Sequence, residues 1–198
     1  VKVCRADDLY CASPTFTGVT DEKGEIMLEL RTALRTFQGY LELTKKTDSP
    51  ETSIYPTLLR LGWPITQEGV TNVTVIAQWS VELNIGLSQV QPDPNRGLLQ
   101  VRFSSCTGYP APNVSFATTP ADEASRSWYA GPHGIPNFNE TKTFGIGAAG
   151  VINAIEGRHV ITSTYSPDNG ATVVKVGETA APVRAGYMTI VLVPPLGN

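Results

Sequence analysis

Residues 97–117 read Gly-Leu-Leu-Gln-Val-Arg-Phe-Ser-Ser-Cys-Thr-Gly-Tyr-Pro-Ala-Pro-Asn-Val-Ser-Phe-Ala, and this stretch decides the class of fold. Residues 98–103 and 114–117 are typical of short strands because β-branched, aromatic and other apolar residues dominate them. The intervening loop, residues 106–113, contains one glycine and two prolines, which mark a turn. The stretch therefore predicts strand, loop and strand, and so a mostly β protein.

The same order of elements continues downstream and occurs a second time upstream. The downstream part contains a glycine-rich turn and then apolar segments, at 145–150, 151–155, 159–165 and 187–193. The upstream copy contains comparable segments at 1–4, 20–24, 25–30, 37–43 and 55–59. No counterpart of residues 98–103 precedes Val1. We therefore expect an open sheet edge at Val1–Cys4 that another segment must cover, and we expect that upstream residues have been removed.

The composition argues for an extracellular β protein without nucleic-acid or membrane functions. The 198 residues are 41% hydrophobic but only 17% charged, with a net charge of −3. A chain with so few basic residues has no surface that could neutralise phosphates. Its apolar runs have the length of strands, so we expect no transmembrane segment. Sparse charge combined with many turn residues is usual for extracellular β proteins.

Three cysteines fit an oxidising compartment in part. Cys4 and Cys11 lie in one short loop and are predicted to form a local disulfide, although two small buried thiols would also explain them. Cys106 remains, and its partner is left open between a cysteine lost upstream, a cysteine of another subunit and no partner.

Two segments carry distinct local signals in the first half of the chain. Residues 20–24 predict a tight turn, and residues 25–30 alternate apolar and polar side chains as a half-buried strand does. Residues 73–90 fit two structures, because their apolar residues alternate strictly but also recur at helical spacing. The segment stops before Pro92-Asp-Pro94, which favours a linker helix.

In the second half, Asn169-Gly170 predicts a hairpin between residues 159–164 and 171–176. Residues 118–142 form a long insertion without clear periodicity, which indicates a functional or packing loop. Its aromatic side chains would contact a sugar or a second subunit, or would fold back over one end of the sandwich. These aromatic residues are Trp128, Tyr129 and Phe138.

These motifs resemble a tandem of carboxypeptidase regulatory-like modules, the transthyretin-like (prealbumin-like) β-sandwich of bacterial surface or secreted proteins. The resemblance rests on Thr20-Asp-x-x-Gly24, Phe37-x-Gly-Tyr-Leu41, Gly97-x-Leu-x-Val101 and Cys106-x-Gly-x-Pro110. It implies two sandwich modules, at residues 1–66 and 97–198, joined by a linker at 67–96. No peptidase zinc site is implied, because neither histidine has a His-x-x-Glu neighbourhood.

The sequence offers little catalytic or metal-binding chemistry. The two histidines, His133 and His159, lie in different segments, and Cys106 stands in a turn without an orienting motif. The pair Asp7-Asp8 could help to bind Ca²⁺, but without a spaced third ligand we interpret it as solvated. We therefore predict no enzymatic activity, no catalytic residue, no metal and no cofactor.

The leading hypothesis is a non-enzymatic extracellular structural protein, a subunit of a filament, coat or appendage assembled from copies of itself through strand edges. The alternative is an adhesive surface lipoprotein that binds carbohydrate through the aromatic insertion, and a third possibility is an accessory domain of a secreted hydrolase. Segment 187–193 could donate its strand to another copy, although closing its own module is the simpler role. The predicted contact residues are Val1, Val3, Trp128, Tyr129, Phe138, Tyr187, Ile190 and Leu192.

Overall fold

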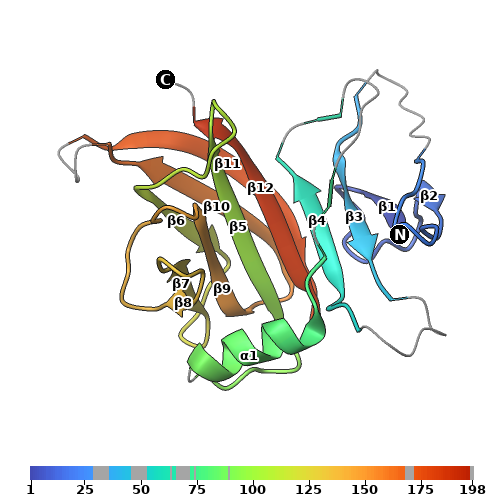
Figure 1. Cartoon of the computed structure of the whole chain (residues 1–198), viewed down its shortest axis with the longest axis horizontal. Coiled ribbons are helices and arrows are strands. Elements are labelled where there is room, and N and C mark those ends of the chain that lie inside the picture. The colour runs from blue at the N-terminus through green and yellow to red at the C-terminus, as the bar shows by residue number, and fades with distance from the viewer. Residues whose placement is uncertain are drawn as a thin grey trace.

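The protein is mostly β, with two sheets and one helix in the part that is described. The computed structural model describes residues 1–28, 36–45, 53–62, 64–65, 72–73, 75–88, 90–167 and 172–196, with the backbone alone for 194–196. The chain matches the prediction of a β protein, and its two halves lie side by side (Figure 1).

The larger sheet contains nine strands in the order β2-β1-β3-β4-β12-β5-β9-β7-β8. Neighbours are antiparallel except that β12 runs parallel to both β4 and β5. From the first edge to the middle, the strands are β2 (Phe16–Thr17), β1 (Lys2–Arg5), β3 (Gly39–Leu43), β4 (Thr57–Leu61) and β12 (Met188–Leu196). From the middle to the second edge they are β5 (Gly97–Ser105), β9 (Ala148–Ala154), β7 (Arg126–Ala130) and β8 (Pro136–Asn137).

The smaller sheet lies behind β5, β9 and β12 in Figure 1 and makes a sandwich with them. It contains β6 (Val114–Thr119), β10 (Gly157–Tyr165) and β11 (Val174–Val183), with β10 in the middle. The β10–β11 hairpin is the one predicted from sequence, while Asn169 and Gly170 themselves lie outside the described residues. The strands of this sandwich all belong to residues 97–196.

Alternating side chains build the sandwich core. Leu99, Val101 and Phe103 of β5 are buried while Arg102 is exposed, as expected for a strand with one face inside. They pack with residues of the opposite sheet, among them Ile161. Since burial of one such side chain stabilises a fold by about 1.5–3 kcal/mol, this cluster is the main source of stability in the second half.

The first half does not form a separate sandwich sheet. Its strand β4 pairs with β12, and β12 pairs on its other side with β5, so strands from both halves belong to one sheet. The predicted division into two sandwich modules is therefore not seen as two independent sheets. Strand β12 closes its own chain, which is the simpler of the two roles considered for segment 187–193.

The open edge expected at Val1–Cys4 is absent, and this prediction is wrong. Strand β1 lies between β2 and β3 and pairs with both, and Val3 and Cys4 are completely buried. The physical reason is the chain reversal after Cys11, which brings Phe16 and Thr17 back alongside β1 as the outermost strand. An intramolecular strand thus covers the edge that was expected to need a partner.

A helix, α1 (Gln78–Ser88), forms within the predicted linker and lies across the lower end of the sheet in Figure 1. It starts at Gln78 because the residue before it, Ala77, makes a β-bridge with Ile54 next to β4. The turn predicted at residues 20–24 is confirmed over residues 21–24, where the Gly24 N–H donates to the Asp21 carbonyl and Gly24 has φ 79°. The strand predicted after it is not formed over residues 25–28, where Met27 is 91% exposed, and residues 29–30 lie outside the described part.

Candidate functional site

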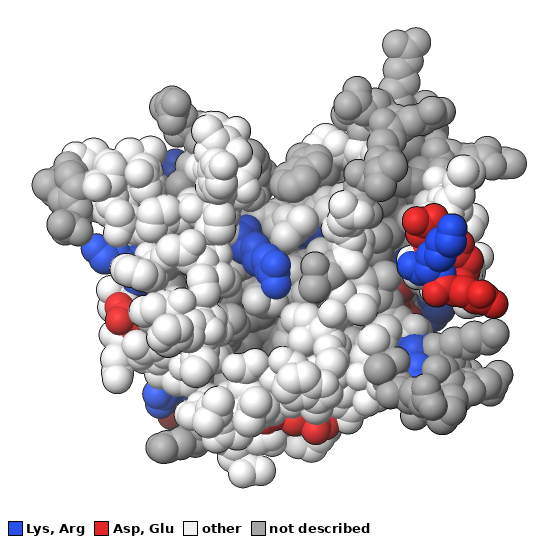
Figure 2. Space-filling view, viewed as in Figure 1, with Lys and Arg blue, Asp and Glu red and all other residues white. Residues whose placement is uncertain are grey.

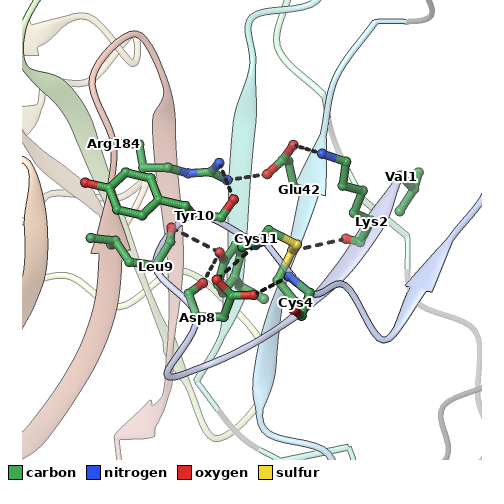
Figure 3. A network of polar contacts seen from close by, with 12 residues as sticks. Val1, Lys2, Cys4, Asp8, Leu9, Tyr10, Cys11, Glu42 and Arg184 are labelled. Carbon is green, nitrogen blue, oxygen red and sulfur yellow. Dashed lines mark hydrogen bonds and ion pairs between the residues drawn. A yellow bond between two sulfur atoms is a disulfide. The ribbon is translucent and has the colours of Figure 1, made fainter.

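The first group of polar and charged residues surrounds a disulfide in the first half of the chain. Cys4 and Cys11 are bonded to each other, as predicted, and both are buried. Figure 3 shows the loop between them lying against Glu42 of β3 and Arg184, which follows β11. The N-terminal loop, β3 and the β11–β12 turn therefore meet at this point.

Glu42 and Arg184 form the ionic centre of this group. The Arg184 guanidinium donates to Glu42 Oε2 at 2.5 Å, and Lys2 Nζ donates to Glu42 Oε1 at 3.0 Å. Arg184 also lies over the ring of Tyr187, 4.3 Å from its centroid. Burial acts to raise the pKa of Glu42, but the hydrogen bonds from Arg184 and Lys2 hold it below its usual value. Glu42 is therefore a charged residue inside the fold.

The two acids of the N-terminal loop are used by the loop itself. Asp8 accepts hydrogen bonds from the backbone N–H groups of Ala12 and Ser13, at 3.0 and 2.9 Å. Asp7 pairs with Arg5 at 3.0 Å on the surface. These contacts lower the pKa of Asp8 through backbone hydrogen bonds and that of Asp7 through its bond with Arg5. Asp8 thus organises the turn that Cys11 closes, which is a role in local structure.

Tyr40 completes the group from β3. Its hydroxyl donates to the Asp8 carbonyl at 2.5 Å, and burial of the ring raises the pKa of Tyr40 to about 12. Among the described residues, the ligating atoms of Cys4, Cys11 and Glu42 lie within 4.8 Å of one another. The sulfurs are bonded together and the carboxylate faces two cations, so this set offers a metal ion no available donor. We interpret the group as a clamp that fixes the first half to the β11–β12 turn.

The second group is the insertion at residues 118–142, which is more ordered than its sequence suggested. It contains β7, which pairs with β9, and β8, which pairs with β7. Arg96 anchors its start through both carboxylate oxygens of Asp122, at 2.9 and 2.7 Å, and this lowers the pKa of Asp122 to about 2. The strands of the insertion extend the large sheet to its second edge.

The three predicted contact aromatics have three different environments. Tyr129 belongs to the sandwich core, and its hydroxyl accepts from the Phe116 N–H at 3.2 Å. Trp128 points to the opposite face, where its indole lies over Gly150, so close that a Cβ at that position would be 2.7 Å from the ring. Phe138 is half-buried beneath the guanidinium of Arg126, 5.6 Å from the ring centroid. The structure therefore brings only Phe138 of the three to the cleft described next.

An open cleft of about 390 Å³ lies beside β8 and is formed by residues of the loop between β7 and residue 139. His133 and Asn139 are exposed at it, and Asn137 and Phe138 are half-buried in it. Asn137 is held by its own loop, because its Oδ1 accepts from the Asn139 N–H at 3.0 Å. The remaining lining residues are apolar or lack a side chain, and they are Gly131, Pro132, Ile135 and Pro136.

The second histidine is a core residue. His159 is fully buried, with Nδ1 2.9 Å from Thr118 Oγ1 and Nε2 2.7 Å from the Ile155 carbonyl. Because the carbonyl can only accept, Nε2 carries the proton and Nδ1 accepts from the threonine. Burial lowers the pKa of His159, so the ring is neutral. It belongs to β10 of the small sheet, whereas exposed Cys106 follows β5 of the large sheet, and its role is structural.

The other predicted contact residues are largely enclosed by their own chain. Val3 is buried in β1, Ile190 is buried in β12, and Leu192 and Tyr187 are half-buried near β4. Val1 is half-buried against the cluster around Leu59. A role for these five in contacts with another copy stays a prediction without a structural argument. Sequence reasoning missed Glu42 and Arg184, for which the only signal was a charged residue inside each of two apolar segments.

The chain matches no family model, no curated protein and no solved structure. The resemblance to transthyretin-like modules is therefore an expectation that rests on the motifs alone. Within the described residues, no helix combines the length and apolarity needed to cross a bilayer.

Proposed function

We propose that this chain is a non-enzymatic extracellular adhesion module that binds a neutral saccharide in the cleft at residues 131–139. The observation that carries the proposal is the cleft itself, about 390 Å³ in volume, next to the half-buried ring of Phe138. Aromatic rings offer an apolar face to the C–H groups of a sugar, while amide and imidazole groups can bond its hydroxyls. Asn137, Asn139 and His133 supply such groups.

The charge distribution favours a neutral ligand. His133 is the one titratable side chain among the described residues that line the cleft, and the guanidinium of Arg126 is stacked on Phe138. Glu140 is oriented toward Asn137 Nδ2, at 3.4 Å. The face seen in Figure 2 likewise has only small, separate groups of charge. A sulfated or sialylated glycan would therefore find no lysine or arginine side chain among the described lining residues to recognise its charge.

The disulfide of the first half supports an extracellular location. The buried Cys4–Cys11 disulfide is the kind of bond that persists in oxidising compartments. As part of the same proposal, we retain the transthyretin-like interpretation for residues 97–198, with residues 1–66 as an extension of its larger sheet.

Assembly through strand edges has less support than the sequence suggested. The large sheet ends at β2 and β8, which contain two residues each. In the small sheet, β11 is an edge strand, but a bulge interrupts its pairing near Gly177, and an exposed Lys175–Glu178 ion pair lies beside it. Short, charged and bulged edges are the features that keep natural sheets from pairing with one another.

The test is a glycan array followed by calorimetric titration of the best ligand. We expect Phe138→Ala to abolish detectable binding and His133→Ala to weaken it, both with an unchanged unfolding midpoint. Tyr109→Ala is the matched control, because Tyr109 is 73% exposed on a different loop. Equal binding by Phe138→Ala and Tyr109→Ala would refute the proposed site. Ordered polymers in negative-stain images would instead support the structural-subunit hypothesis.

A further inference from the structure

Helix α1 exposes a row of apolar side chains to solvent, whereas a helix that only covers a sheet turns its apolar face toward the sheet. Trp79, Leu83 and Leu87 expose 68%, 55% and 55% of their surface, and they follow one another at intervals of four residues. The opposite side of the helix buries only Val81, with Asn84 and Ile85 half-buried. Trp79, Leu83 and Leu87 thus form an exposed stripe, which we call the Trp79 stripe.

Such a stripe is informative because helical residues four positions apart share one face. Single exposed apolar side chains are common on monomers, whereas a contiguous row marks an interaction site. Figure 2 shows the lower edge of the molecule, where α1 lies in Figure 1, as white apart from one acidic patch at its centre and a small charged group at its left end.

We propose that the Trp79 stripe is the interface with a second copy of this chain, packed as an antiparallel helix pair about a two-fold axis at Leu83. The spacing is symmetric about Leu83, so this axis places Leu83 against its own equivalent. The same operation sets Trp79 against Leu87 of the second copy, and Gly86 against Ser80 of the second copy. An isologous contact requires this self-complementarity. Small residues at the last pair let the two backbones approach closely.

The charges of α1 fit a pairing of identical copies. The helix carries one charged side chain, Glu82, and its carboxylate already accepts a hydrogen bond from Gln78 Nε2 at 2.7 Å. In the antiparallel register, Glu82 is level with residue 84 of the second copy and not with its own equivalent, so no like charges meet. A membrane surface is a poorer partner, because the helix has no lysine or arginine and the chain has a net charge of −3.

The available area predicts a weak dimer. The three exposed side chains offer roughly 350 Å² per copy, which makes about 700 Å² for the pair. Stable specific interfaces bury about 1,200–2,000 Å² in total, so the stripe supplies about half of this and its surroundings must supply the rest. We therefore expect a dissociation constant in the micromolar range or weaker.

Sedimentation velocity from micromolar to near-millimolar concentration tests the association. We expect a monomer–dimer equilibrium that Leu83→Glu weakens at least tenfold, since a carboxylate would be buried against its own equivalent. Val173→Glu is the control, because Val173 is 63% exposed away from α1. Unfolding curves of both variants exclude misfolding as the cause. A monomer at every concentration, or a Leu83→Glu variant that still dimerises, would overturn the proposal.

Cysteine cross-linking in a Cys106→Ser background tests the register. Leu83→Cys should form a disulfide-linked dimer by itself. Trp79→Cys mixed with Leu87→Cys should cross-link efficiently, whereas either variant alone should not, since like positions lie on the order of 12 Å apart along the axis. Self-linking of Leu87→Cys would reveal a parallel pair and contradict the proposal. Binding of the monomer to neutral phosphatidylcholine vesicles would contradict it in favour of a membrane contact.

Discussion

Removing the charge of Glu42 should lower the free energy of unfolding of this protein by several kcal/mol. Glu42 is 3% exposed and its two oxygens accept from Arg184 and Lys2. Glu42→Gln preserves the shape but leaves the buried Arg184 guanidinium without a counter-charge. Loss of one partner from a buried pair costs about 3–5 kcal/mol, and we expect a loss of this size in the free energy of unfolding.

A double-mutant cycle separates the pair from its surroundings. Arg184→Met removes the guanidinium together with its stacking on Tyr187, and we expect a loss of similar size. The double variant should be more stable than the sum of the two losses predicts, by about 2 kcal/mol or more, because neither charge then remains alone. Lys2→Met is the control, and it should cost less than about 1 kcal/mol since 42% of the Lys2 side chain is exposed.

Urea unfolding followed by tryptophan fluorescence gives these free energies if the m-value is constant across the set. Additive losses in the double variant, or a loss below about 1 kcal/mol for Glu42→Gln, would refute the clamp between the two halves.

Four further predictions follow from individual contacts. Replacing Cys4 and Cys11 by serine should cost about 2–3 kcal/mol, as expected for a short loop, and non-reducing intact-mass analysis of the native protein should find no free thiol in this peptide. The free energy of unfolding should decrease as the pH falls below about 6.5, because the lowered pKa of His159 keeps its ring neutral in the fold while the unfolded chain binds a proton. His159→Gln should remove this dependence of the free energy of unfolding on pH, and exposed His133→Gln should not. A second decrease in the free energy of unfolding should begin as the pH falls through the ordinary range of a glutamate, because Glu42 has a lowered pKa in the fold. Gly150→Ala should cost at least about 2 kcal/mol, since its Cβ would lie 2.2 Å from the Leu99 carbonyl oxygen, while Gly86→Ala on exposed α1 should stabilise dilute monomer by about 0.5–1 kcal/mol; equal unfolding midpoints for the two variants would contradict the close approach of Gly150 to β5.

The local features of this fold could be predicted from sequence because they depend on neighbours in the chain. The disulfide joins cysteines of one short loop, and the turn at residues 21–24 depends on Asp21 and Gly24. The strand expected at residues 25–30 had the correct alternation, but no neighbouring strand pairs with residues 25–28. Alternation is a necessary feature of a half-buried strand and does not by itself provide a partner.

The long-range features could not be predicted, because one sequence contains no signal for them. Alternation along β3 places Glu42 on the same face as Tyr40, but nothing near it in the sequence indicates Arg184 as its partner. Adjacent aromatic residues in β7 point to opposite faces, which sends Tyr129 into the core and leaves Trp128 outside. The composition of the insertion suggested that its aromatic residues share one surface. Alternation along β7 instead places them on opposite faces of the sheet.

The position of β12 has a consequence for the time at which the protein can fold during synthesis. Thr57 of β4 pairs with Met188, and Leu98 of β5 pairs with the same residue from the other side. On the ribosome, both β4 and β5 therefore have an unpaired side until the last strand of the sheet has been made. A nascent or truncated chain would expose two apolar strand edges at once, and such edges are sites of aggregation and of chaperone binding.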